Sequence, residues 1–262
     1  MLKFAANVMT LFTDRPVPDR IAAAAEAGFD AVEIPFPYDA PAVDLRNTLG
    51  FTGLPVTLIA APPPNYTGGM AGFAAVPNGQ MRFQHDFRRA LRYANALKAQ
   101  HVHVMSGSAF GEAARATMIE NLTWACDFAP RQSLTIEPMN DADLPGYFMN
   151  DFSLAADVIK AVGRKNLGLQ FDTYHAHMIT GDVAGTWDRY GHLASHVQIA
   201  SAPDQAEPDG GEIDFYGFFS QLAKGGYAGW VGADYRPSGK TIDGLGWLAR
   251  LKGDDGAFKK QA

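Results

Sequence analysis

The sequence predicts an α/β protein that folds as one (β/α)8 barrel, the TIM barrel. Short runs of β-type residues alternate with Ala-rich or amphipathic stretches along the chain, which is typical of βα units around a parallel sheet. The length of 262 residues matches one such barrel. No linker or compositional break divides the sequence, so residues 1–262 are expected to form a single domain.

Eight β-type runs can be counted in chain order, and each is short enough to be one strand of the barrel. They begin at Leu2 (LKFAAN), Ala31 (AVEIP), Val56 (VTLIAA), His101 (HVHVM), Leu134 (LTIEP), Leu167 (LGLQFD), His196 (HVQIA) and Trp230 (WVGADY).

The stretches between these runs predict helices. One is PDRIAAAAEAG, where Gly28 supplies a C-terminal stop. Another is FQHDFRRALRYANALKA, and its spacing predicts an inward face made of Phe87, Leu91, Tyr93, Ala94 and Leu97.

Two connections are longer than the others, residues 61–80 after the third run and residues 201–215 after the seventh. Both follow the carboxyl ends of strands, and that face of a parallel barrel carries the active site. They are therefore candidate walls or lids, although the first is equally compatible with an ordinary surface loop.

Composition excludes several classes of function. Lys and Arg number 22 against 28 Asp and Glu, a formal charge of −6, so no nucleic-acid partner is expected. Cys126 is the only cysteine and lies in an apolar stretch, so we expect a buried thiol, no internal disulfide and a cytoplasmic protein. No signal-peptide pattern and no apolar run of the roughly 18 residues that a transmembrane helix needs occurs, so no membrane association is expected.

Four oxygen-bearing residues stand at or near the ends of four consecutive strand runs: Glu137, Asp172, Gln198 and Asp234. Because the last inward side chains of neighbouring barrel strands converge, these four predict one binding site. Three carboxylates and one amide carbonyl suit a hard divalent ion, Mg2+ or Mn2+, whereas zinc sites usually recruit His or Cys. A single strand-end carboxylate can instead cap the following helix or meet an Arg.

His101 and His103 form a second, weaker signal, an HxH pair on one face of a strand. The pair begins its strand, at the amino-terminal face of the barrel, where residues usually serve stability. We therefore expect a structural role for both histidines.

Several motifs together resemble hydroxypyruvate isomerase and its close relatives, within the xylose-isomerase-like TIM barrels. The resemblance spans nearly the whole chain and is carried by LKFAAN, VEIPFPYD, TIEPMN followed by LPGY, FDTYH, HVQIA, EPDGGEI and GWVGADYRP. It implies an isomerase or epimerase of a small hydroxy-keto compound, with the four residues above at the metal-ligand positions. It also implies that Glu137 and Asp234 double as acid/base groups.

The implied reaction moves a carbonyl between adjacent carbons through an enediolate. A metal chelated by the substrate oxygens would stabilise that charge, and one carboxylate on each side of the substrate would move the proton. His175, three residues beyond Asp172, would lie just past the strand end, where its imidazole can hydrogen-bond a substrate oxygen.

The chain also departs from the family pattern. Asp234 replaces a Glu, so its carboxylate falls roughly 1.5 Å short, and a misplacement on that scale can cost about a hundredfold in rate. Ser108 stands near the position of a usual Lys and Gln205 near that of a usual Arg; Arg236 is a candidate replacement cation. These positions are expected to contact substrate, and the changes indicate a substrate other than hydroxypyruvate.

Two alternatives remain at this stage. One is a barrel that binds metal and a sugar or keto acid but has lost catalysis. The other is an endonuclease-IV-like phosphodiesterase, which would use several zinc ions, many His ligands and a basic surface. Relatives of the resembled family often associate, so the partners expected are a small-molecule substrate and a second copy of this chain.

Overall fold

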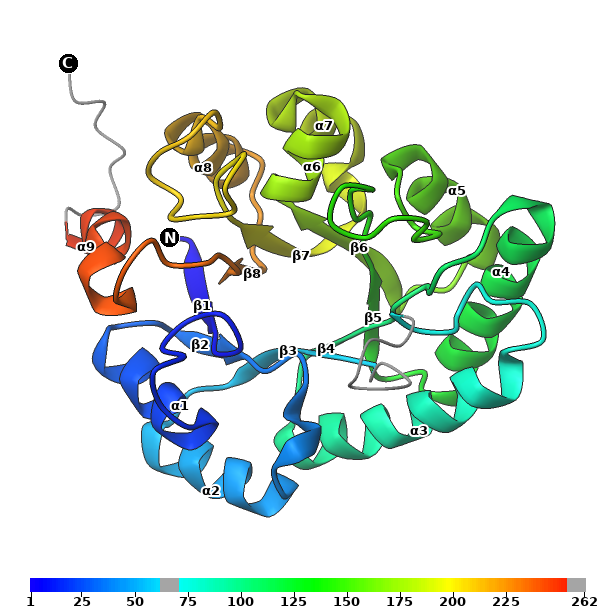
Figure 1. The fold of residues 1–262 in the computed structure, drawn as a ribbon, viewed down its shortest axis with the longest axis horizontal. Helices are drawn as coiled ribbons and strands as arrows, with labels where there is room; N and C mark the ends of the chain where they lie inside the picture. Colours follow the sequence, from blue (N-terminus) through cyan, green and yellow to red (C-terminus); the bar gives the residue numbers. More distant parts are fainter. Residues whose placement is uncertain (62–70, 254–262) are drawn as a thin grey trace.

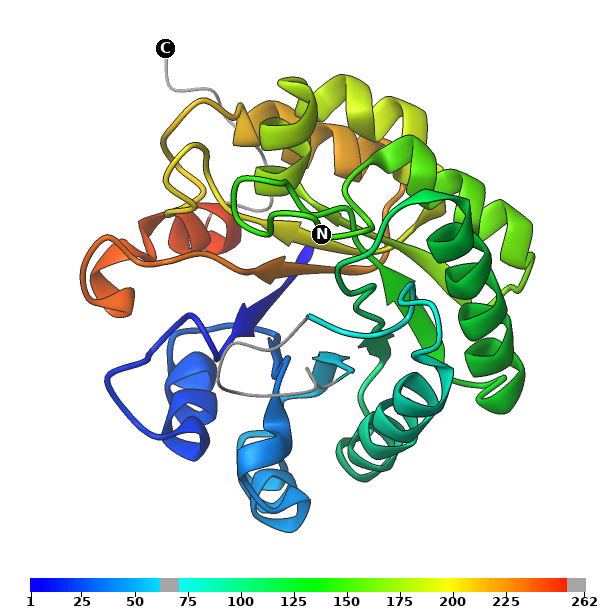
Figure 2. The same cartoon turned by 45° about the vertical axis from the view of Figure 1, so that its right-hand side comes forward.

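The computed structural model describes residues 1–61 and 71–253. Eight parallel strands close into a barrel in sequence order, because β8 pairs with β1. Figure 1 shows the helices arranged outside the strands, and Figure 2 shows the same arrangement after a turn of 45°. The predicted (β/α)8 barrel is therefore confirmed.

Every predicted β-type run contributes one strand of the barrel. The strands are β1 Lys3–Asn7, β2 Ala31–Glu33, β3 Val56–Ala60, β4 His101–His103, β5 Ser133–Ile136, β6 Leu167–Asp172, β7 Ala194–Ile199 and β8 Trp230–Ala233.

The helices follow the strands as expected for βα units. They are α1 Val17–Glu26, α2 Ala42–Thr52, α3 Gln80–Leu97, α4 Gly111–Phe128, α5 Phe152–Val162, α6 Thr173–Thr180, α7 Val183–Tyr190, α8 Phe215–Lys224 and α9 Gly246–Gly253, with 3-10 turns η1 Pro37–Asp39, η2 Gly191–Leu193 and η3 Thr241–Gly244.

Helix α3 shows how the pattern of apolar residues becomes packing. Phe87, Ala94 and Leu97 are buried as predicted, but Leu91 and Tyr93 are only partly buried. Phe83 and Ala90 complete the buried face instead, because residues three and four apart share one side of a helix. After α1, Gly28 has φ +87°, a backbone conformation that glycine adopts without strain.

Helix α9, the last helix in the described residues, packs against the first strand, β1. The ring of Trp247 on α9 packs edge to face against Phe4 on β1, with centroids 5.4 Å apart, and Figure 1 shows α9 close to the N-terminus.

Cys126 is buried as expected, and burial raises the pKa of its thiol to about 12, which makes it unreactive. None of the helices in the described ranges is long and apolar enough to cross a membrane.

The two long connections differ in what the structure describes. Residues 62–70 of the first lie outside the described residues. The second is tied to the segment after β8: the backbone N–H of Arg236 donates to the carbonyl of Gln205 at 2.7 Å, and Glu207 accepts from the backbone N–H of Ser238 at 2.9 Å. It follows β7, at the carboxyl ends of the strands.

Candidate active site

A cavity of about 220 Å³ opens where the strands end. It is smaller than the roughly 300–1,000 Å³ of pockets that hold drug-sized ligands, so it suits a substrate of a few carbons. Its lining residues are Asn7, Met9, Thr10, Pro35, Phe36, Leu58, Ala60, His103, Met105, Glu137, Met139, Leu144, Gln170, Gln198 and Asp234.

The strand ends place the four predicted ligands close together. Glu137 follows β5, Asp172 ends β6, Gln198 is the next-to-last residue of β7, and Asp234 follows β8. Pairing of β6 with β7 sets Asp172 beside Gln198. We call Glu137, Asp172, Gln198 and Asp234 the oxygen cup.

The carboxylates of the oxygen cup repel one another in a dry environment. Burial raises the pKa of Glu137 well above its usual range, and the charges of Asp172 and Asp234 raise it further. Burial likewise raises the pKa of Asp172 and of Asp234 to about 7. No lysine or arginine is among the described residues that line the cavity, and a metal ion is one group that could balance the charge of these carboxylates.

Asp172 serves two roles with its two oxygens. Its Oδ1 accepts from the backbone N–H of His175 at 2.8 Å and so caps the start of α6. The helix cap that the sequence left as an alternative is therefore present. The second oxygen remains for the oxygen cup, since a carboxylate has several acceptor positions.

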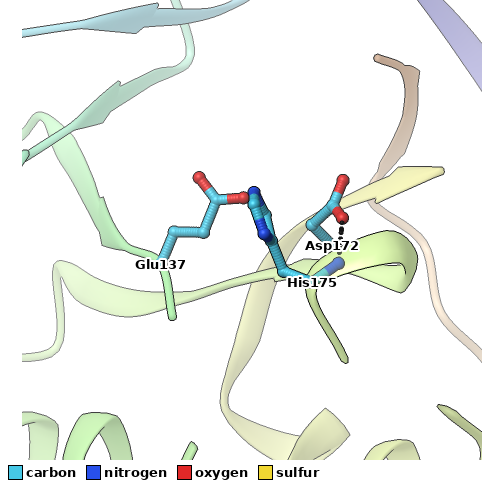
Figure 3. Close-up of side chains that lie close together, drawn as sticks. All are labelled: Glu137, Asp172 and His175. Carbon is cyan, nitrogen blue, oxygen red and sulfur yellow. Dashed lines mark hydrogen bonds between the residues drawn. The ribbon is translucent and has the colours of Figure 1, made fainter. Parts of the chain in front are cut away.

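His175 lies with Glu137 and Asp172 in a buried group whose ligand atoms are all within 4.8 Å of one another, and Figure 3 shows these side chains gathered together. Its Nδ1 faces the backbone N–H and the side-chain amide of Asn140, at 3.2 and 2.9 Å. The orientation of that amide is fixed, because its oxygen accepts from the backbone N–H of Asp143.

The tautomer of His175 follows from these contacts. With donors on Nδ1, the ring proton of the neutral imidazole must be on Nε2. Burial lowers the pKa of His175 to about 4, so the ring is neutral at pH 7. The Nε2 of His175 therefore carries a proton and can act as a hydrogen-bond donor.

Neither His175 nor the other three predicted substrate contacts is among the lining residues of the cavity. Ser108 is exposed and forms an isolated antiparallel bridge with Tyr147. Gln205 is partly buried with φ +53°, and Arg236 is exposed. The structure does not bring these three side chains into contact with the oxygen cup.

Sequence reasoning missed the polar residues inside the barrel. Glu33 on β2 accepts from Nε2 of Gln198 at 2.7 Å, and burial raises the pKa of Glu33 to about 8. Gln170 on β6 donates to Glu137 at 2.8 Å and to Gln198 at 2.7 Å. The available signal was the residue type: a Glu and a Gln stand within apolar strand runs, where a polar side chain needs a buried partner.

The expectation for His103 was wrong. It ends the short strand β4 rather than lying far from the site, it lines the cavity, and its Nδ1 is 3.6 Å from Oε2 of Glu137. His101 does stay structural, with its Nδ1 2.8 Å from the hydroxyl of Ser133. The three-residue length of β4 explains the difference, because two residues further along the strand already reach the barrel mouth.

Known proteins share this architecture and much of the sequence. Residues 21–251 match the family model described as Xylose isomerase-like TIM barrel. A 2-oxo-tetronate isomerase of Cupriavidus necator is 41% identical over 254 residues, covering 95% of this chain and 98% of that protein. A hydroxypyruvate isomerase of Escherichia coli is 34% identical over 254 residues, covering 95% of this chain and 98% of that protein.

A solved structure agrees with this assignment at the level of the backbone. The crystal structure of AP endonuclease, family 2 from Brucella melitensis superposes with a TM-score of 0.92 at 40% identity, covering 95% of this chain and 99% of that chain. The fold, the family model and the curated relatives named as isomerases coincide over nearly the whole sequence, and the chain belongs to the xylose isomerase-like TIM-barrel family.

Proposed function

We propose that this protein is a divalent-metal-dependent isomerase of a small hydroxy-keto acid, of the kind named in its hydroxypyruvate and 2-oxo-tetronate isomerase relatives. The observation that carries the proposal is the oxygen cup: three carboxylates and an amide at the mouth of the barrel, with the pKa values of the carboxylates raised by burial. Such a set requires a cation and is suited to moving protons near neutral pH.

Glu137, Asp172, Gln198 and Asp234 would hold the ion, and Mg2+ or Mn2+ fits a set of oxygen donors. When bound, a divalent ion supplies Lewis acidity that stabilises negative charge on the substrate oxygens. Everything else required for the proton transfer can come from side chains of this chain.

The proton transfer is assigned to Glu137 and Asp234. They come from β5 and from the end of β8, and both line the cavity from different strands. One carboxylate removes a proton from the hydroxyl-bearing carbon, and the other, which starts protonated, returns a proton to the former carbonyl carbon through an enediolate of the substrate, while the hydroxyl proton passes to the former carbonyl oxygen. The two carboxylates end with their protonation states exchanged. The Nε2–H of His175 donates to a substrate oxygen as that oxygen gains charge.

The substrate is proposed to be of the four-carbon type rather than hydroxypyruvate itself. Relatives named 2-oxo-tetronate isomerase are 37–41% identical to this chain, against 34–36% for those named hydroxypyruvate isomerase.

The sequence is compatible with two other functions. A metal-binding barrel that has lost catalysis is favoured by the short side chain of Asp234 and is the second candidate. A phosphodiesterase is disfavoured by the formal charge of −6 and by a site built from carboxylates and amides. The same experiment separates all three.

The experiment is proton exchange in deuterated water. The metal-loaded protein is incubated with hydroxypyruvate, 2-oxo-tetronate and neutral ketoses, and deuterium incorporation at the reacting carbons is followed by NMR. We expect incorporation with the four-carbon acid, and its loss in Glu137→Ala and Asp234→Ala. Asp127→Ala, which removes an exposed carboxylate on α4 paired with Arg164, is the matched control.

The outcomes are distinct. Tight divalent binding without exchange on any compound would favour the catalytically impaired barrel. A cluster of bound zinc ions together with cleavage of a DNA phosphodiester would support the endonuclease and overturn the isomerase.

A further inference from the structure

Glu33 is a fully buried carboxylate at the end of β2, and it contacts the oxygen cup without belonging to it. We propose that Glu33 is a positioning residue that holds the amide of Gln198 with its oxygen turned toward the cup. This inference rests on the proposed metal-dependent function and names a residue on which that function depends.

Gln198 needs such a residue because an amide has two unlike ends. Its carbonyl oxygen can bind a cation, whereas its NH2 group is a donor and cannot. In the structure the NH2 group donates to Oε2 of Glu33 at 2.7 Å, and Oε1 accepts from Gln170 at 2.7 Å. Oε1 retains a second acceptor position, which is the one that a metal ion would take.

The contact with His196 fixes which carboxylate oxygen of Glu33 faces Gln198. Oε1 of Glu33 lies 2.5 Å from Nε2 of His196, and both side chains are fully buried. This contact occupies Oε1 and leaves Oε2 facing Gln198, where Oε2 accepts from the NH2 end of the amide.

Strand β8 leaves space for this carboxylate. A Cβ added at Gly232 would lie 1.8 Å from Oε1 of Glu33, closer than any real contact. Gly232 pairs with Gln198 in the sheet. The absence of a side chain at Gly232 therefore leaves space at the same level of the barrel where the Glu33 carboxylate meets Gln198. The position of Glu33 is therefore built into two neighbouring strands as well as into its hydrogen bonds.

The proposal is tested by metal affinity rather than by activity alone. The dissociation constant for Mn2+ is measured by calorimetry, and the unfolding temperature of the metal-free protein is measured alongside it. Glu33→Leu removes the acceptor, and Asp86→Leu, at a buried carboxylate on α3 that does not line the cavity, is the matched control. The double variant Glu33→Gln/Gln198→Glu exchanges the two functional groups.

We expect Glu33→Leu to bind Mn2+ at least about tenfold more weakly, as when other residues that orient metal ligands are removed. Asp86→Leu should retain the wild-type affinity. The exchanged pair should recover it, because a carboxylate at position 198 has an oxygen at both ends and an amide at position 33 can donate to it.

The results separate this inference from the proposed function. If the wild-type protein binds no Mn2+, the metal-dependent function fails. If the wild type binds Mn2+ and Gln198→Leu weakens binding while Glu33→Leu does not, Glu33 is no positioning residue. If the exchanged pair folds but does not recover affinity, the loss in Glu33→Leu comes from the vacated space, and the orientation argument is overturned.

Discussion

Asn140 directs two hydrogen-bond donors, its backbone N–H and its side-chain NH2, at the same ring nitrogen of His175. Both residues are buried, and Asp143 fixes the side-chain amide of Asn140 from the other side. The loop after β5 therefore decides which nitrogen of His175 carries the proton. Since Nε2 carries it, His175 can act as a hydrogen-bond donor, which is the role proposed for it.

The first prediction concerns this relationship. Asn140→Asp replaces one of the two donors beside Nδ1 with an acceptor and leaves the backbone N–H in place, so the ring proton of His175 should shift in part to Nδ1. The proposed donor to the substrate is then weakened, and kcat/KM should fall by up to about tenfold, the equivalent of one hydrogen bond of ~1.4 kcal/mol. Long-range ¹⁵N–¹H NMR of the histidine ring reports the tautomer directly.

Asn150→Asp is the control, because it adds the same charge in the same loop while its amide contacts only Asp141 among the described side chains. Its ring spectrum should match that of the wild type. A wild-type spectrum with the proton on Nδ1 would contradict the assignment of His175.

The second prediction concerns the length of Asp234. Asp234→Glu extends the carboxylate by one methylene, and the side chain faces the cavity with Thr10 as its hydrogen-bond neighbour at 3.4 Å. If the short side chain limits proton transfer, the exchange rate on hydroxypyruvate should rise, by up to about a hundredfold. Asp234→Asn should abolish exchange on every substrate, since the amide cannot take the proton.

Comparing Asp234→Glu with Asp234→Asn shows whether the length of the Asp234 side chain limits proton transfer. An unchanged or lower rate in Asp234→Glu would mean that the site has adjusted to aspartate and that another residue sets the substrate preference.

The third prediction follows from the raised pKa values of Asp172 and Asp234, each about 7. Below pH 7 these groups hold protons in the metal-free protein, and an ion must displace them to bind. The affinity for Mn2+ should therefore increase as the pH rises from 6 to 8. Calorimetry in buffers of different ionisation enthalpy should show proton release at pH 6 and much less at pH 8.

The same pKa shifts predict how the metal-free protein responds to pH. The folded state holds protons that the unfolded state releases near pH 4, so these carboxylates reduce the free energy of unfolding as the pH rises through 7. The buried histidines, with lowered pKa values, act in the opposite direction only below their usual pKa of about 6.5. Denaturant unfolding at pH 7 and 8 should therefore show lower stability at pH 8, and Mn2+ should reverse the loss.

The fourth prediction compares two glycines. Gly232→Ala forces a methyl group against the Glu33 carboxylate and should reduce the free energy of unfolding by about 1–3 kcal/mol. Gly50 lies inside α2 with nothing within 4 Å of an added Cβ, so Gly50→Ala should be neutral or stabilising by about 0.5–1 kcal/mol. Equal stability of the two variants in urea titrations would contradict the packing around Glu33.

The barrel could be predicted because its signals are local. Each strand is a short β-type run, and the helix between two strands has its own amphipathic period, as α3 illustrates. The ends of β5 to β8 could also be predicted to converge, since closed parallel barrels bring consecutive strand ends to one mouth. Glu137, Asp172 and Asp234 were found for that reason.

The contacts across the barrel could not be predicted in this way. Glu33 and Gln198 are 165 positions apart, and nothing in the local pattern of β2 indicates which side chain it will meet. His103 was misplaced because the reach of a strand depends on its register and length. These quantities are set by pairing with neighbouring strands and cannot be read from one run alone.

By itself the sequence determined the (β/α)8 barrel and the set of oxygen donors at the strand ends, because periodicity and residue type carry that information. Only the tertiary structure decided the tautomer of His175, the orientation of the Gln198 amide and the raised pKa values of the carboxylates. Each of these depends on burial and on hydrogen-bond partners from distant strands, and those exist only once the barrel has closed.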